Sequence, residues 1–266
     1  MGIAAKTPDL ALITPVEYLV DAIDFNGTNS DIIYANNLFS DIDLDYEATG
    51  THTKSMTMSL WIKPDLGANN TGAHVFRIDD SGGQQSRLLL TSDASEFVRA
   101  VFFHSYNSTN RNSFFIGWAT AYGDLNRYIW NHIVFSTKVE LSSGSETWTH
   151  RLRINGVDKD SYVTNDSTFD GTIDTTANSY FGRDPLGLNR YTGCLTEFFL
   201  DDNFYDLDSV SQVRKFLSVD GKPVNPPSSK LVHLTGSSST WTNKGTTALG
   251  TQTLNNITDC ADSPSD

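Results

Sequence analysis

The sequence is poor in cysteine, in basic residues and in long apolar runs. Two of its 266 residues are cysteine, Cys194 and Cys260, and 19 lysines and arginines stand against 32 acidic residues. Two isolated cysteines do not make a disulfide framework, so we expect Cys194 to be a buried free thiol, with a bridge to Cys260 as the less favoured alternative. A chain of this length buries enough surface to fold without disulfides.

The charge and the lack of long apolar runs exclude two classes of partner. A net charge of −13 argues against nucleic acid, because phosphate binding requires clustered lysine and arginine. No apolar run approaches the roughly 20 residues of a membrane-spanning helix. Residues 1–6 lack the basic start and apolar core of a secretory signal. We therefore expect a soluble protein with no membrane insertion and no signal peptide.

What the sequence does contain is period-two alternation, most clearly in residues 129–157. Ile133 and Phe135 share one face of a first run, and Leu152 and Ile154 share one face of a second. A connection rich in serine and glycine joins the two runs, and an Asn-Gly dipeptide ends the second. This pattern predicts a long antiparallel hairpin with a tight turn after it.

Similar short runs, separated by turn residues, continue along the chain and predict an all-β protein with two antiparallel sheets. The predicted strands are residues 22–25, 31–35, 55–63, 73–78, 87–91, 97–104, 113–120, 161–164, 179–182 and 192–200. One short C-terminal helix is predicted from Asp208 to Leu217, with Val210, Val213 and Leu217 along one stripe.

The chain divides into three parts by composition. Residues 1–20 form a proline-interrupted N-terminal arm, 21–218 the strand-rich domain, and 219–266 a polar C-terminal extension. The extension holds few apolar anchors, Leu231, Leu234 and Trp241 among them, too few for a core of its own. We therefore expect both terminal arms to be extended and to lie on another surface.

Several short motifs are similar to those of the laminin-G-like, or concanavalin A-like, jelly rolls. They follow in family order at Ile23–Gly27, Ser59–Pro64, Trp130–Val134, Ile154–Gly156, Phe181–Arg183 and Tyr191–Phe198. The resemblance implies a two-sheet jelly-roll sandwich. A second string resembles the C-terminal segment attached to such domains in tailed-phage structural proteins; it comprises Tyr205–Leu207, Arg214–Leu217, Gly221–Val224 and Asn243–Gly245.

The resemblance implies a non-enzymatic bacteriophage virion structural protein, either capsid-decorating or tail-associated. Its arms would dock on neighbouring subunits, so its partners would be other virion proteins and further copies of itself. It would be assembled in the host cytoplasm and located in the virion. The alternative is a carbohydrate-binding module for adhesion to host-surface glycans. Both functions are compatible with one jelly roll.

Signatures of catalysis are weak. There is no Gly-x-Ser-x-Gly elbow, no phosphate-binding Gly-Lys-Ser/Thr loop and no His-Glu-x-x-His. Asp41, Asp43 and Asp45 have the alternation of a glycoside hydrolase strand, but they lie in an acidic loop region. His132 follows Trp130 within a predicted strand, where a hydrogen-bonded structural role is favoured. We expect no enzymatic activity.

Candidate binding residues lie in the loops and their adjoining strands. For a glycan, which needs an aromatic surface beside amide or charged groups, the candidates are Tyr106, Asn107, Trp118, Tyr122 and Arg127. For Trp118 a core position is the favoured alternative. We expect no cofactor, but related jelly rolls often hold calcium, and the oxygen clusters Asp79 with Asp80 and Asp201 with Asp202 are candidate ligands. Ordinary solvated turns explain both clusters as well.

Overall fold

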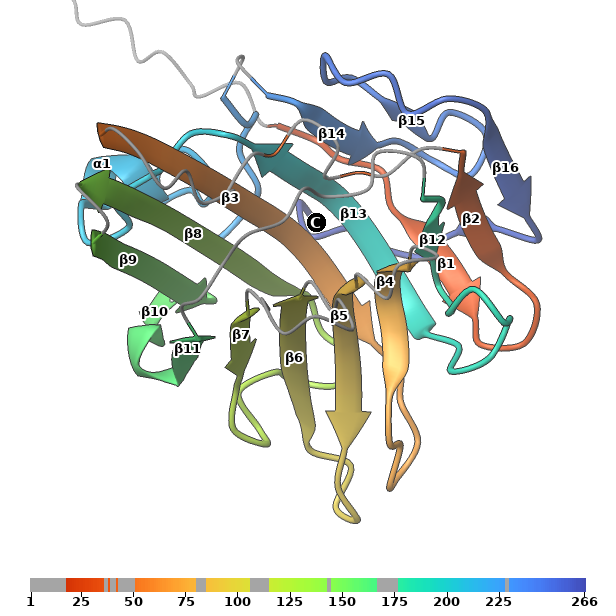
Figure 1. Ribbon diagram of the computed structural model, residues 1–266. Helices are drawn as coiled ribbons and strands as arrows, with labels where there is room; N and C mark the ends of the chain where they lie inside the picture. The colour runs from red at the N-terminus through yellow and green to blue at the C-terminus, as the bar shows by residue number, and fades with distance from the viewer. Residues whose placement is uncertain are drawn as a thin grey trace, which may run out of the picture.

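The computed structural model describes residues 18–35, 38, 42, 51–79, 85–105, 115–142, 145–166, 177–227 and 230–266. Its strands form two antiparallel sheets packed face to face, with the long strands β3, β8 and β13 curving across one layer (Figure 1). This arrangement confirms the predicted all-β sandwich. Of the predicted N-terminal arm, only residues 18–20 are among those described.

The first sheet has the strand order β10-β9-β8-β3-β13-β1-β17, with β14 also pairing with β13 and β15 pairing with β14. Its strands are β1 (Ile23–Asn26), β3 (Thr51–Pro64), β8 (Asn131–Ser142), β9 (Ser145–Ile154), β10 (Val157–Asp158), β13 (Thr192–Asp201), β14 (Val232–Thr235), β15 (Thr242–Asn243) and β17 (Thr258–Asp259).

The second sheet has the order β11-β7-β6-β5-β4-β12-β2-β16. Its strands are β2 (Asp31–Tyr34), β4 (Ala73–Asp79), β5 (Gln85–Ser92), β6 (Val98–Ser105), β7 (Phe115–Ala119), β11 (Val163–Asp166), β12 (Ser179–Phe181) and β16 (Gln252–Asn255). A single 3-10 turn, Asp160–Tyr162, precedes β11.

Aromatic side chains from both sheets meet in the main core. Phe198 of the first sheet contacts Phe76 and Phe181 of the second, with ring centroids 5.4 and 5.3 Å apart. Phe135 of the first sheet packs on Phe102 of the second at 5.7 Å. Edge-to-face and tilted contacts of this kind stabilise a core beyond the area they bury. The two sheets are therefore held together by a continuous row of rings.

The hairpin predicted from alternation is β8 and β9. Ile133 pairs with Ile154 and Phe135 pairs with Leu152, and all four side chains are buried. The turn after β9 is also as predicted, because the Asn-Gly dipeptide takes the positive φ that such a turn requires. Half-buried strands leave one face to solvent, but part of the outer face of this hairpin is covered, because Val134 and Ser136 are buried there.

The cover consists of the segment after β13. Tyr205 and Phe216 from this segment pack on Phe199 of β13 and Val134 of β8 in a second buried cluster. The ring of Tyr205 meets that of Phe216 at 5.1 Å with an interplanar angle of 86°. Half-buried alternation cannot reveal this cover, because the covering residues lie some distance along the chain.

The helix in this segment is shorter than predicted. Helix α1 spans Val210–Val213, and the side chain of its N-cap, Ser209, makes no capping hydrogen bond. The chain then turns so that Phe216 enters the second cluster. The predicted stripe is divided, because Leu217 is buried whereas the side chain of Val210 is 69% exposed. In the part of the chain that the structure describes, no helix has the length and apolarity needed to cross a membrane.

Several apolar anchors of the C-terminal extension are buried. Val232 and Leu234 are completely buried, and Trp241 is buried with its indole N–H donating to the hydroxyl of Tyr34 (3.1 Å). Its strand β14 pairs with β13, β16 with β2 and β17 with β1. The extension was expected to lie on another surface because it has too few anchors for a core of its own, and the surface on which its described strands lie is the sandwich itself.

Strand β13 contains an irregularity on which the extension depends. Its first half pairs with β1, its second half pairs with β14, and the register shifts between Thr196 and Phe199. Glu197 occupies this position with φ of +52°. Its buried carboxylate accepts hydrogen bonds from His233 Nε2 (2.7 Å), Tyr18 Oη (3.0 Å) and the hydroxyl of Thr235. These partners offset the cost of burying a carboxylate.

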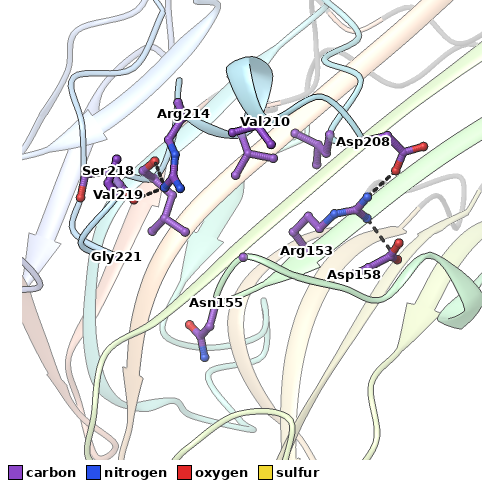
Figure 2. Close-up of a pocket in the computed structure, with 13 residues that line it drawn as sticks. Arg153, Asn155, Asp158, Asp208, Val210, Arg214, Ser218, Val219 and Gly221 are labelled. Carbon is purple, nitrogen blue, oxygen red and sulfur yellow. Dashed lines mark hydrogen bonds and ion pairs between the residues drawn. The ribbon is translucent and has the colours of Figure 1, made fainter.

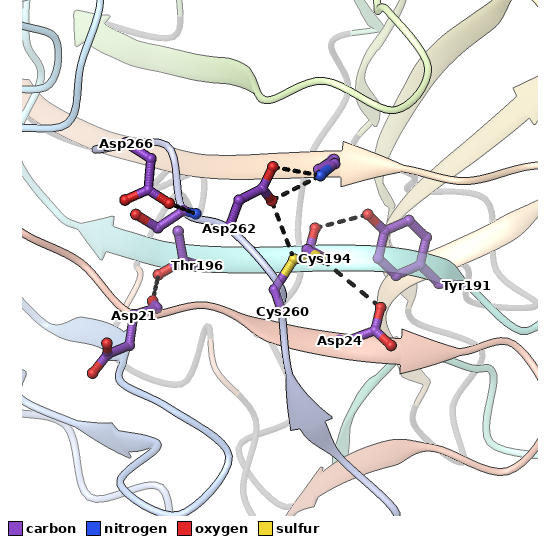
Figure 3. Close-up of a disulfide and its surroundings, with 10 residues drawn as sticks. Asp21, Asp24, Tyr191, Cys194, Thr196, Cys260, Asp262 and Asp266 are labelled. Atoms are coloured by element: carbon purple, nitrogen blue, oxygen red, sulfur yellow. Dashed lines mark hydrogen bonds and ion pairs between the residues drawn. A yellow bond between two sulfur atoms is a disulfide. The ribbon is translucent and has the colours of Figure 1, made fainter.

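Cys194 is not a free thiol, which corrects the sequence prediction. It forms a disulfide with Cys260, whose Cα lies 6.0 Å away (Figure 3). Strand β1 pairs with both β13 and β17 and so brings the two cysteines together. Beyond the bridge, Asp262 forms an ion pair of 2.7 Å with Lys63 of β3. The last residues are thus tied to the centre of the first sheet.

His132 has the structural role that the sequence predicts. The side chain is buried, its Nε2 and the hydroxyl of Ser59 share a hydrogen bond of 2.8 Å, and its ring stacks on Trp61 at 4.8 Å. Burial disfavours the charged imidazolium and lowers the pKa of His132 to about 3. The residue is therefore neutral at physiological pH.

We expect the disulfide to add roughly 2–4 kcal/mol to the free energy of unfolding, because it closes a long loop in the unfolded chain. A Cys194→Ser/Cys260→Ser variant should remain folded but unfold at lower temperature and lower denaturant concentration. Wild type in dithiothreitol should behave like this variant, and dithiothreitol should not affect the variant. Equal melting temperatures of oxidised and reduced wild type would contradict the prediction.

We also expect stability to fall as the pH is lowered from 6.5 towards 3, in part through His132. In this window the unfolded chain binds a proton that the native imidazole does not, which costs up to about 1.4 kcal/mol per pH unit. A His132→Gln variant should show a flatter dependence of unfolding free energy on pH. Urea titrations of both proteins at several pH values measure the difference, and identical slopes would rule out this role.

Candidate functional site

Of the predicted glycan-binding residues, Tyr122 and Arg127 have side chains that the structure describes. Tyr122 and Arg127 lie in the loop after β7, at the end of the sandwich where β6 begins. Tyr106 and Asn107 fall outside the described residues. Trp118 lies in β7, but its side chain is also outside the description. Tyr122 and Arg127 therefore make up the part of the predicted site that the structure describes.

Around these two residues the structure brings together exposed aromatic side chains from two loops. We call the group Phe97, Tyr122, Arg127 and Tyr128 the aromatic rim. The side chains of Phe97, Tyr122 and Tyr128 are 56%, 42% and 53% exposed, values unusual for large rings. A hydrogen bond from the N–H of Gly123 to the carbonyl of Val98 (3.0 Å) holds the loop after β7 against the start of β6. Phe97 lies close against Gly123.

Arg127 links the loops of the rim to one another. Its guanidinium forms ion pairs with Glu96 and, at 3.2 Å, with Asp65. It also lies over the ring of Tyr128, 4.3 Å from the centroid, which is a cation–π distance. The Arg127 side chain is 16% exposed, whereas the two carboxylates are nearly half exposed. The arginine thus connects three loops and presents carboxylate oxygens to solvent.

Tyr122 is supported from the adjacent strand. The guanidinium of Arg99 lies over its ring at 4.5 Å. Arg99 Nε donates to Thr91 Oγ1 (3.0 Å), and the same hydroxyl oxygen lies 3.4 Å from the Tyr122 hydroxyl group. A ring held on one face by a fixed cation leaves its other face for a ligand. The arrangement is therefore partly preorganised.

Tyr128 of the rim and Glu96, which pairs with Arg127, have a backbone conformation that is costly for their residue type. Glu96 and Tyr128 both have φ of +63°. A left-handed conformation costs a residue with a Cβ of the order of 1–3 kcal/mol, and such positions concentrate at functional sites. The N–H of Tyr128 donates to the carbonyl of Pro64 (2.9 Å), which holds the ring outward. Glu96 and Tyr128 both contact Arg127, and backbone strain at these two residues supports a binding role for the rim.

Three members of this site were missed or only partly recognised from the sequence. Phe97 was assigned to the start of a strand, and neither Glu96 nor Arg99 was identified as a candidate. An available signal was a bulky aromatic residue directly after a turn of Asp, Ala, Ser and Glu. The sequence alone does not show that Phe97 lies near Tyr122, because this proximity depends on β5, β6 and β7 being neighbours.

The predicted calcium ligands give a different picture. Asp201 is buried, which raises the pKa of its carboxyl group. Its oxygens accept hydrogen bonds from Tyr205 Oη (2.8 Å) and Asn203 Nδ2 (3.0 Å). Asp202 is exposed beside it. The side chains of Asp79 and Asp80 lie outside the described residues, so calcium binding there stays a prediction.

A separate cleft of about 550 Å³ lies between the turn after β9 and the α1 segment (Figure 2). Arg153, Asp158 and Asp208 lie at one end of it, Val210 in the middle, and Arg214 beside Ser218 at the other end. Arg153 pairs with Asp208 at 2.5 Å and with Asp158 at 3.2 Å. The charged end of the cleft is therefore largely occupied by its own ion pairs.

Next to this cleft, oxygens of Asp158, Asp160 and Asp208 lie within 4.8 Å of one another, a spacing that a hard cation could bridge. However, Arg153 contacts all three carboxylates, and Arg151 contacts Asp160 and Asp208. A calcium ion would have to compete with two guanidinium groups. Among the described clusters, the aromatic rim is the better candidate for a ligand.

Comparison with known proteins is informative about the family and the fold. Residues 39–202 match the family described as the Concanavalin A-like lectin/glucanases superfamily. A search of curated proteins gave no match.

Several solved structures are similar at low identity. A heptameric SAP-like pentraxin from Limulus polyphemus has 10% identity and a TM-score of 0.41, over 71% of this chain and 78% of the pentraxin. A Bacteroides ovatus protein proposed to bind carbohydrate has 10% identity and a TM-score of 0.46, over 92% of this chain and 61% of that one. The enzymatically active domain of tailspike protein 2 from bacteriophage CBA120 has 14% identity and a TM-score of 0.36, over 59% and 23%.

None of these three similarities supports a functional inference for this chain. The family match covers more than half of the sequence and agrees with the two antiparallel sheets described above. The chain therefore belongs to the concanavalin A-like lectin/glucanase superfamily, through a laminin G-like domain at residues 39–202.

Proposed function

We propose that this protein is a non-enzymatic carbohydrate-binding module that uses the aromatic rim to hold a saccharide. The observation that carries the proposal is the group of exposed rings of Phe97, Tyr122 and Tyr128 together with an ion-paired arginine. Aromatic faces stack on the apolar faces of sugar rings, and the exposed carboxylates of Glu96 and Asp65 accept hydrogen bonds from hydroxyl groups. The lectin-like fold of the family is consistent with such a role.

A second, compatible candidate is a structural protein of a bacteriophage virion, decorating the capsid or attached to the tail. It is favoured by the similarity of residues 204–266 to segments of tailed-phage structural proteins. The proposed docking of the C-terminal arm on neighbouring subunits receives less support. The described part of that arm packs on its own sandwich through β14, β16 and β17. The virion candidate thus depends mainly on the sequence resemblance.

For the carbohydrate role, we expect Tyr122→Ala and Tyr128→Ala each to cost about 1–2 kcal/mol of binding free energy, a loss of roughly 5- to 30-fold in affinity. A glycan array would identify the ligand, and calorimetric titration would measure its affinity for each variant. Val219→Ala, at an exposed position of the distant cleft, serves as the control and should bind like wild type. Wild-type affinity in both tyrosine variants would exclude the rim as the site.

Absence of enzymatic activity is part of the same proposal. The string Asp41, Asp43 and Asp45, considered from the sequence as a weak hydrolase signature, lies outside the described residues. Release of reducing ends from the glycans that bind, lost in Asp43→Asn, would refute the non-enzymatic role.

For the virion role, we expect the protein to co-purify with intact phage particles through a density gradient, in a fixed ratio to the major capsid protein. Quantitative mass spectrometry of the purified particles measures this ratio. A host protein of similar abundance should be depleted in the same gradient. If the chain is depleted to the same extent, it is not a virion component.

A further inference from the structure

We propose that the aromatic rim selects neutral saccharides and discriminates against anionic ones such as uronates, sulfated glycans and sialosides. This inference rests on the carbohydrate binding proposed above and specifies its substrate class. It follows from the way the charged groups of the rim are arranged: carboxylates face solvent, and the cation of the rim is already paired.

Arg127 is the group that would otherwise recruit an anion. Arginine commonly binds carboxylate or sulfate by offering two N–H groups side by side. Here one terminal nitrogen contacts Glu96, the other contacts Asp65, and one face of the guanidinium lies on Tyr128. An anionic sugar would have to displace a carboxylate that is held within the same chain.

The neighbouring cations are similarly engaged. Arg99 donates through Nε to Thr91 and spreads its guanidinium over Tyr122. Lys159 forms an ion pair of 2.6 Å with Asp124, and both side chains are largely buried. Each cation described around the rim therefore has a specific contact within the protein.

The carboxylates of the rim loops outnumber the basic groups. Loops 65–72, 93–97 and 120–130 carry four acidic residues and one arginine; the acidic residues are Asp65, Asp93, Glu96 and Asp124. Glu96 and Asp65 are 47% and 49% exposed, compared with 16% for Arg127. A ligand on the rings thus meets negative potential and hydrogen-bond acceptors. Hydroxyl groups satisfy acceptors by donating, whereas anionic groups are repelled.

The direct test compares matched saccharides. An array that pairs galactose oligomers with galacturonate oligomers, and neutral glycans with their sulfated or sialylated forms, is probed with the full chain at physiological salt. We expect hits on neutral members and roughly tenfold or weaker binding of each anionic partner. Equal or stronger binding of the anionic members would overturn this inference while leaving carbohydrate binding intact. No hits of either kind would instead refute the proposed function, and the inference with it.

A variant tests the physical cause. Glu96→Gln combined with Asp65→Asn removes both charges that neutralise Arg127 and should raise the affinity for the anionic member of a pair, relative to its neutral partner, by about tenfold or more. Glu140→Gln is the matched control, because Glu140 is a similarly exposed carboxylate paired with Lys138 on the β8–β9 hairpin. It should leave the ratio unchanged. An unchanged ratio in the double variant, with its melting temperature preserved, would show that Arg127 pairing does not set the preference.

Discussion

The shift of pairing along β13 is the constraint on which the rest of the structure depends. Glu197 sits at this shift, where one edge of the strand passes from β1 to β14. Its carboxylate binds His233 and Thr235 from the extension and Tyr18 from the segment before β1. A single buried side chain thus connects three segments that are remote in sequence. The same strand carries Phe198, which contacts the opposite sheet, and Cys194, which binds the end of the chain.

This rigid frame explains how a site can be built from loops. The antiparallel pairing of β5, β6 and β7 places the turn before β6 beside the loop after β7. Glu96 and Arg127 then connect the two loops, and Asp65 adds a third. The left-handed backbone at Glu96 and Tyr128 is tolerated because these contacts hold it in place. The chemistry of the rim therefore follows from interactions between loops rather than within any one of them.

Local patterns predicted local structure well. Alternation at Ile133 and Phe135 identified the β8–β9 hairpin, and the Asn-Gly pair identified its following turn. What the sequence did not show depends on contacts between distant segments. Cys260 meets Cys194 only because β1 lies beside both β13 and β17, and Trp241 appears isolated until Tyr34 is placed beside it. Likewise, Tyr122 and Arg127 could be identified within one predicted loop, whereas Phe97 joins them only through contacts between separate loops.

The order of the strands has a further consequence for association between molecules. Within the described residues, the edge strands of the first sheet are β10, β15 and β17, each two residues long, and those of the second are β11 and β16, each four residues long. These short strands offer few unpaired backbone groups to another chain, but β10 pairs only with Arg153 and Ile154 of the ten-residue β9, so most of the outer edge of β9 has no strand partner among the described residues. Association of two copies through added strands is therefore limited to a few places, and the outer edge of β9 is one of them.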